Sequence, residues 1–186
     1  MILEEAIELI RYKNICKQGK QCWADLGCGS GTFTKALADL LSPGSVIYAV
    51  DKNKYALDKI PEKFRNATIK KIHGDFITTE MPFILDGIIM GNSLHFVKDK
   101  TSFIKNIEKH LKERASILIV EYDIDMANPW VPFPVSFRTL KQLFENFKFS
   151  SIIKINERSS LYQRGLIYSA IIHNVCDYNA QDKDLG

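Results

Sequence analysis

Short apolar runs alternate with amphipathic segments along almost the whole chain. The runs have the length of buried strands, whereas the segments between them space their apolar residues for one face of a helix. This alternation predicts an α/β fold with a mainly parallel sheet and helices on both faces. Strands are expected at Cys22–Leu26, Ser45–Val50, Thr68–His73, Asp86–Met90, Ser116–Glu121, Ser151–Asn156 and Leu166–His173. Helices are expected at Leu3–Lys13, Thr32–Leu41, Lys54–Ile60, Lys100–Lys112 and Ser136–Asn146.

The last two of these seven strands are expected to be antiparallel neighbours. Only residues 157–164 join them, and a parallel connection needs a dozen or more residues. The sheet therefore changes direction at its carboxyl-terminal end.

Three glycines at alternate positions follow the first predicted strand, in the segment DLGCGSGT at residues 25–32. Glycines let the chain turn sharply and let a ligand approach the backbone, and the free N–H groups of the following helix point at that ligand. Such a loop suits a dinucleotide, a mononucleotide or another ligand with a carboxylate. A dinucleotide fingerprint needs glycine where Thr32 stands, and Asp25 suits a cationic group better than a pyrophosphate.

This segment resembles the first signature of class I S-adenosylmethionine (SAM)-dependent methyltransferases, and the resemblance extends over Cys22 to Asn174. It implies a Rossmann-like sheet of order 3-2-1-4-5-7-6 whose last strand is antiparallel. It also implies that SAM is the cofactor and S-adenosylhomocysteine the product. The alternatives are another Rossmann-like nucleotide binder or a glycine loop that only packs. The residues implied at the methionine end of the cofactor are Asp25, Gly27, Cys28, Gly29 and Gly31.

The ends of the next two strands carry further cofactor candidates. Asp51 ends the second strand about twenty residues after the glycines, where a carboxylate accepts the ribose hydroxyls; Lys52 follows it. Asp75 and Phe76 follow the third strand, where the family places an aspartate at the adenine amino group and lines the ring with the next residue. Each aspartate could instead serve as a turn or helix-capping residue.

The fourth strand runs into GNSLHF at residues 91–96, where the resemblance places the methyl group against its acceptor. Methyltransferases that act on base amines or glutamine carry an Asn/Asp-Pro-Pro-Tyr/Phe motif there, and only Asn92 matches it. Asn92 is a candidate cofactor contact. The segment is more similar to small-molecule methyltransferases. His95 is the candidate general base, if the acceptor must lose a proton, and a candidate substrate contact; alternatively it orders the loop.

A loop rich in proline and aromatic residues follows the fifth strand at residues 124–134. It is interpreted as a substrate wall or lid, with Tyr122 and Trp130 as substrate contacts. The alternative is a loop that its prolines and aromatics merely pin to the surface.

Length and composition restrict the remaining choices. The 186 residues, 46% of them hydrophobic, suit one domain at residues 1–178 followed by a polar tail at 179–186. No apolar run approaches the roughly 20 residues of a membrane span, and the amino terminus lacks a leader pattern, so we expect a soluble, cytoplasmic protein without a membrane partner.

The net charge of +3 is weak evidence for binding to nucleic acid. The cysteines show no zinc spacing, and no metal site is expected; they are Cys16, Cys22, Cys28 and Cys176.

Together these features predict a SAM-dependent methyltransferase acting on O, N or C of a small molecule. Three alternatives remain: an RNA methyltransferase, a non-catalytic SAM-binding regulatory subunit and, third, a dehydrogenase. Two features depart from the family. Residues 111–115 lack the usual glycine-rich turn, and only about twenty residues precede the first strand, so the pocket is either open or completed by a second copy in a homodimer.

Overall fold

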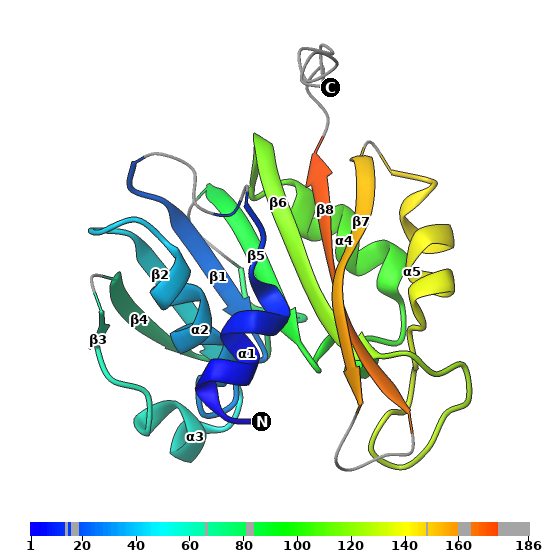
Figure 1. Ribbon diagram of the computed structural model, residues 1–186, viewed down its shortest axis with the longest axis horizontal. Coiled ribbons are helices and arrows are strands. Elements are labelled where there is room, and N and C mark those ends of the chain that lie inside the picture. Colours follow the sequence, from blue (N-terminus) through cyan, green and yellow to red (C-terminus); the bar gives the residue numbers. More distant parts are fainter. Residues whose placement is uncertain are drawn as a thin grey trace, which may run out of the picture.

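The computed structural model describes residues 1–13, 15, 19–65, 67–80, 84–147, 149–159 and 165–174. These form an eight-stranded sheet with helices packed against both faces (Figure 1). The strands are β1 (Cys22–Leu26), β2 (Val46–Asp51), β3 (Lys63–Phe64), β4 (Ala67–His73), β5 (Leu85–Gly91), β6 (Leu111–Tyr122), β7 (Phe149–Ser159) and β8 (Leu166–Asn174). The helices are α1 (Leu3–Ile10), α2 (Thr32–Leu40), α3 (Lys54–Asp58), the 3-10 turn η1 (Leu94–Phe96), α4 (Lys100–Glu108) and α5 (Phe137–Phe144).

The strand order is β3-β4-β2-β1-β5-β6-β8-β7. The seven predicted strands occur in the predicted order, and β8 runs antiparallel to both β6 and β7. The prediction of seven strands was wrong by one. Strand β3 pairs antiparallel with β4 at Lys63 and Phe64, and two residues are too few to show a strand pattern in the sequence.

Neighbouring residues of each central strand are buried on opposite faces of the sheet. Trp23 and Ile89 pack in the cluster that contains α1 and α2, which lie in front of the sheet in Figure 1. Ala24 and Ile88 pack in the cluster that contains α4 and α5 on the other face. Because both faces are covered, these strands appear in the sequence as continuous apolar runs.

Some predicted helices extend too far. Helix α4 ends at Glu108 rather than Lys112, and β6 begins at Leu111, well before the predicted start. The reason is tertiary: Leu85 donates its N–H to the carbonyl of His110 at 2.7 Å, and Leu111 pairs with Leu85 across the sheet. Residues 111–115, for which no turn glycine was found, therefore belong to β6.

The other differences are confined to element ends. Helix α1 ends at Ile10 because Arg11 takes extended backbone angles, and α3 ends at Asp58 with Lys59 as its cap. Ser136 lies outside α5 as its N-cap and accepts the N–H of Thr139. In the described part of the chain no helix is both long and apolar enough to cross a membrane. Cys16, Cys176 and the predicted tail at 179–186 lie outside the described residues.

Candidate functional site

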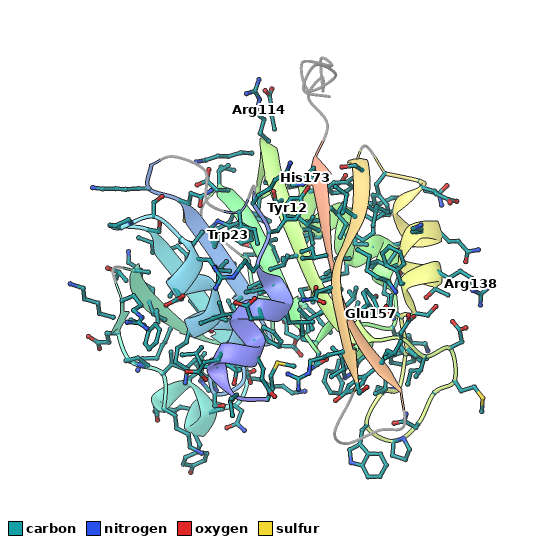
Figure 2. All side chains as sticks on the ribbon, in the orientation of Figure 1. Tyr12, Trp23, Arg114, Arg138, Glu157 and His173 are labelled. Atoms are coloured by element: carbon teal, nitrogen blue, oxygen red, sulfur yellow. The ribbon has the colours of Figure 1, made fainter. Side chains whose placement is uncertain are left out.

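The parallel strands β1, β2, β4, β5 and β6 direct their carboxyl ends to the lower edge of the sheet in Figure 1. Arg114, near the start of β6, stands at the opposite edge in Figure 2. Every predicted cofactor residue lies in or directly after one of the first four of these strands, or in the loop that leads from β1 into α2. The topology thus brings to one edge residues spread over most of the sequence.

The glycine loop is fixed against three strand ends. Gly27 and Cys28 donate their N–H groups to the carbonyl of Val50 on β2, at 2.9 and 3.1 Å. Gly27 has φ +78, and a Cβ there would lie 2.6 Å from Ser93 Cβ after β5 and 3.1 Å from the ring of Phe76 after β4. Alanine at Gly27 would therefore be strained and too large for the space.

Asp25 is a buried carboxylate with one oxygen unused. Its Oδ2 accepts a hydrogen bond from Thr34 Oγ1 at 2.6 Å, while Oδ1 is buried without a partner among the described residues. Burial raises the pKa of Asp25 to about 7; the Thr34 hydrogen bond lowers it and the charge of Asp51 raises it further. A cation or N–H donor beside Oδ1 would remove this penalty.

Asp51 connects the end of β2 to the same loop. Its Oδ2 accepts the N–H of Gly29 at 2.7 Å and its Oδ1 accepts the N–H of Asn53 at 2.8 Å. Each oxygen keeps a lone pair that a ligand hydroxyl could use. A Cβ at Gly29 would meet no atom within 4 Å, so the loop is open at this point.

The residues predicted beside adenine lie at the end of β4. Asp75 is exposed, and its Oδ1 accepts the N–H of Ile77 at 2.9 Å, as in an Asx turn. The ring of Phe76 packs edge-on against Phe103, with centroids 5.9 Å apart. Lys52 is exposed, and its carbonyl accepts a hydrogen bond from His73.

Asn92 follows β5, the neighbour of β1. It adopts the left-handed conformation with φ +55, and its N–H donates to the carbonyl of Val120 at 2.8 Å. Its side-chain oxygen is buried without a partner among the described residues, like Oδ1 of Asp25. Next to it, Ser93 Oγ donates to the carbonyl of Leu26 at 2.6 Å and joins the two loops. Two unpartnered oxygens on adjacent strand ends suit a ligand with N–H donors.

His95 lies in η1 and forms a buried pair with Glu121 at the end of β6. Its Nδ1 is 2.7 Å from Glu121 Oε2, and its backbone N–H donates to Oε1 at 3.1 Å. The two side chains are only 3% and 1% exposed. The ring centroid of Tyr122 is 6.2 Å from that of His95, so these two predicted substrate residues lie close together.

The loop after β6 is attached to η1 from one side. Phe133 donates its N–H to the carbonyl of His95, and Lys100 Nζ donates to the carbonyls of Val97 and Phe133 at 2.8 and 2.9 Å. Burial lowers the pKa of Lys100, and the charge of Glu121 partly offsets that effect. Trp130, at the tip of the loop, is 74% exposed. Packing within the described residues therefore does not fix its indole in the position expected of a substrate contact.

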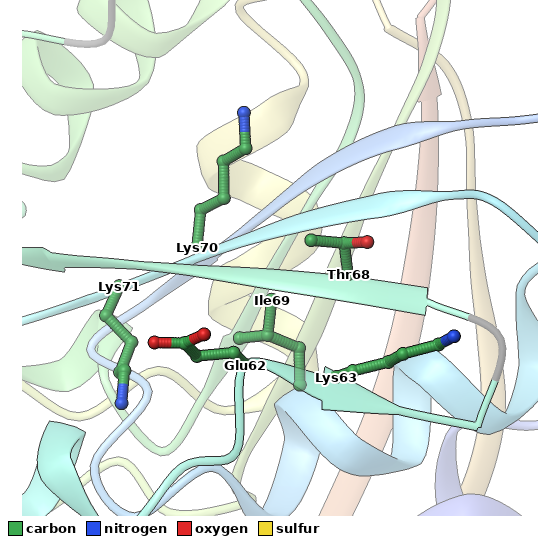
Figure 3. A pocket seen from close by; sticks show the side chains of 6 residues that line it. All are labelled: Glu62, Lys63, Thr68, Ile69, Lys70 and Lys71. Carbon is green, nitrogen blue, oxygen red and sulfur yellow. The ribbon is translucent and has the colours of Figure 1, made fainter.

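Three further points about the described residues give no additional site. No group of three or more His, Cys, Asp and Glu side chains could hold a metal ion there. A hollow lies at the β3–β4 edge, separated from β5 by β2 and β1 (Figure 3). In it Lys71 Nζ donates to the carbonyl of Ile60 at 3.0 Å, a bond that supports the fold. The free thiols of Cys22 and Cys28 are half-buried and buried, and burial raises the pKa of both.

Sequence reasoning assigned no role to four residues that shape the site: Thr34, Ser93, Lys100 and Glu121. The sequence could have indicated a role for Glu121, because it is the one charged residue in the run SILIVEY at 116–122. A charged side chain inside a buried strand needs a partner. Thr34 donates to the side chain of Asp25 nine residues earlier, whereas Ser93 and Lys100 donate to backbone carbonyls, and no spacing pattern indicates these bonds.

The sequence and the fold are both similar to those of known proteins. The profile of a family described as a methyltransferase domain matches residues 24–117, from β1 to β6. An uncharacterised methyltransferase of Mycobacterium tuberculosis is 27% identical over 105 residues, which are 56% of this chain and 52% of the relative. The chain thus spans about half the length of that relative.

Two further proteins are similar over most of the chain. A demethylmenaquinone methyltransferase of a Geobacillus species is 24% identical over 171 residues, 90% of this chain and 68% of the relative. The crystal structure of magnesium protoporphyrin IX methyltransferase from Synechocystis with bound SAM covers 93% of this chain and 78% of its own. It has a TM-score of 0.66 at 13% identity, a likeness of fold.

Proposed function

The chain belongs to the methyltransferase-domain family, and from this premise we propose that it transfers a methyl group from SAM to a small apolar acceptor. The observation that carries the proposal is the buried, unpartnered Oδ1 of Asp25 beside a glycine loop that is open at Gly29. A buried carboxylate oxygen without a partner is costly unless a ligand completes it.

The residues at this edge fit SAM. Asp25 Oδ1 and the side-chain oxygen of Asn92 would accept N–H groups of the methionine ammonium, and Asp51 would accept the ribose hydroxyls. Asp75 and Phe76 would meet the adenine. When bound, SAM supplies an electrophilic methyl carbon on a positively charged sulfur. The chain's own task is to hold an acceptor in line with that carbon.

The acceptor is proposed to be aromatic or otherwise apolar. Large apolar side chains are exposed in η1 and in the loop after β6: Phe96 is 52% exposed, Met126 82% and Trp130 74%. Such side chains favour an apolar surface over a phosphate backbone. The name of the Geobacillus relative points to the quinone class.

Calorimetry with SAM, S-adenosylhomocysteine and NAD tests the proposal. We expect both sulfur compounds to bind and NAD not to bind. Binding of NAD alone would overturn the cofactor assignment. S-adenosylhomocysteine binding without methyl transfer to any acceptor would favour a regulatory protein, and salt-dependent binding of RNA would favour an RNA methyltransferase.

A further inference from the structure

The pairing of His95 with Glu121 is more specific than loop anchoring requires. Both carboxylate oxygens of Glu121 are committed to this one residue: Oε1 accepts its backbone N–H and Oε2 faces its ring nitrogen. The backbone bond alone would attach η1 to β6. The second contact fixes the orientation of the imidazole, which has no effect on the path of the chain.

The chemistry of the contact determines which ring nitrogen is basic. With Glu121 as a carboxylate, which only accepts hydrogen bonds, the contact at Oε2 is made by a proton on Nδ1 of His95. In a neutral imidazole the other nitrogen, Nε2, then has the free lone pair. A buried carboxylate behind a histidine thus leaves Nε2 as the proton acceptor.

The other charged and titratable groups near the pair have separate partners. Lys100 Nζ donates to two backbone carbonyls, and Tyr168 donates its hydroxyl to the carbonyl of Val135 at 2.9 Å. The ring of Tyr122 lies beside the ring of His95, with centroids 6.2 Å apart. Among the described residues, the hydrogen bonds found for the Glu121 side chain are therefore those to His95.

We propose that Glu121 is the positioning residue of a general base at His95, and that the acceptor is a phenol or hydroquinone whose hydroxyl loses its proton to Nε2. The inference rests on the proposed function and deepens it. The hydroxyl O–H bond breaks and its proton passes to Nε2, while the electron pair it leaves makes the acceptor nucleophilic. A bond forms from the acceptor to the methyl carbon, and the carbon–sulfur bond breaks with its electron pair on sulfur. Glu121 stabilises the imidazolium until solvent takes the proton.

Two substitutions separate catalysis from structure. His95→Asn keeps an amide N–H near the position of Nδ1, and so keeps the bond to Glu121, but removes Nε2. Glu121→Gln keeps the shape and removes the charge. His110→Asn and Glu113→Gln are matched controls at the amino-terminal end of β6, whereas Glu121 lies at the opposite end of that strand.

The assay uses 1,4-dihydroxynaphthalene and methyl-labelled SAM. We expect His95→Asn to lower kcat about 100- to 1,000-fold and Glu121→Gln about 10- to 100-fold. In Glu121→Gln the acidic limb of the pH–rate profile should move to lower pH, because the imidazolium has lost its carboxylate. Affinity for S-adenosylhomocysteine should stay within about twofold in both variants, and the controls should match the wild type.

Full activity in His95→Asn, or an unmoved pH limb in Glu121→Gln, would overturn the proposal. Nitrogen-15 NMR of the histidine ring provides a test without turnover: a protonated Nε2 in the wild type also overturns it, even if Glu121→Gln fails to fold. If S-adenosylhomocysteine binds but the hydroquinone is not methylated, the acceptor class is wrong. If S-adenosylhomocysteine does not bind, the proposed function itself fails.

Discussion

The glycine loop after β1 and the turn after β5 touch each other through Ser93 and Leu26, yet they are held by different interactions. Backbone N–H groups hold the glycine loop, through Gly27 to a carbonyl and through Gly29 to a carboxylate. In the turn after β5 buried side chains take a larger part: Ser93 Oγ donates to Leu26, and Glu121 from another strand binds both the backbone N–H and the ring of His95.

This difference between backbone and side-chain interactions fits the roles proposed for the two regions, cofactor binding for the glycine loop and acceptor binding for the turn after β5. A loop held by its own backbone leaves its glycine surface open for a ligand that is the same in every turnover. The loop after β6, next to the turn after β5, carries exposed side chains such as Met126 and Trp130. The proposed cofactor region is thus held mainly by its own backbone, and the proposed acceptor region includes a loop with exposed apolar side chains.

The largest expected effect tests the electrostatics of the cofactor region. Burial raises the pKa of Asp25 to about 7 in the folded chain, whereas the unfolded chain ionises near the ordinary value of 3.8. Stability from this group is therefore fully present below about pH 4 and is lost as the pH rises to about 7, on the order of 4 kcal/mol in total. Asp25→Asn should remove that decline, as measured by urea unfolding across this range.

The same carboxylate should couple proton release to cofactor binding. A ligand ammonium favours the ionised form of Asp25, so wild-type affinity for S-adenosylhomocysteine should increase from about pH 5 to about pH 7.5. In Asp25→Asn the affinity should be weaker and nearly independent of pH. Equal pH dependence in the two proteins would show that Asp25 does not meet the ligand's charge.

A second prediction compares two glycines of one loop. Gly27→Ala places a Cβ 2.6 Å from Ser93 at positive φ, so it should cost about 2–4 kcal/mol of stability. Gly29→Ala meets no atom within 4 Å and should cost only about 1 kcal/mol, but it occupies the open face. We expect its affinity for S-adenosylhomocysteine to fall at least about tenfold. Unchanged affinity in Gly29→Ala would place the ligand elsewhere.

Local patterns were sufficient to predict the alternation of strands and helices, and the family resemblance implied the strand order that the sheet has. The spacing of the glycines and the position of Asp51 depend on residues near in sequence, and the open α/β topology then determines where they meet. The errors arose from tertiary pairing: β3 is formed only because β4 lies beside it, and β6 starts early because Leu111 pairs with Leu85.

The acceptor region was less predictable for the same physical reason. His95 was identified as a candidate, but Glu121 lies 26 residues away and only the sheet brings it to the ring. The loop after β6 was expected near the site, and its attachment through Lys100 to backbone carbonyls has no sequence signature. Contacts between a side chain and a distant backbone group depend on the final fold.

A smaller effect is expected from Asp51→Ala. The substitution removes the acceptor for the N–H of Gly29 and the proposed acceptor for the ribose hydroxyls, so affinity for S-adenosylhomocysteine should fall by about 2 kcal/mol, roughly 30-fold. Calorimetry gives the affinity, and circular dichroism checks the fold. Asp58→Ala, an exposed carboxylate at the end of α3, is the control. Unchanged affinity in Asp51→Ala would refute the ribose assignment.

The smallest effect is expected at the tip of the acceptor loop. Trp130→Ala should change the free energy of unfolding by less than about 0.5 kcal/mol, because the indole is exposed, and should leave S-adenosylhomocysteine affinity unchanged. If Trp130 contacts the acceptor, KM for 1,4-dihydroxynaphthalene should rise about three- to tenfold with kcat nearly constant, since uniform binding is lost. Ile84→Ala, exposed at the start of β5, should alter neither constant. A loss of cofactor affinity in Trp130→Ala would instead show that the two regions are coupled through the loop after β6.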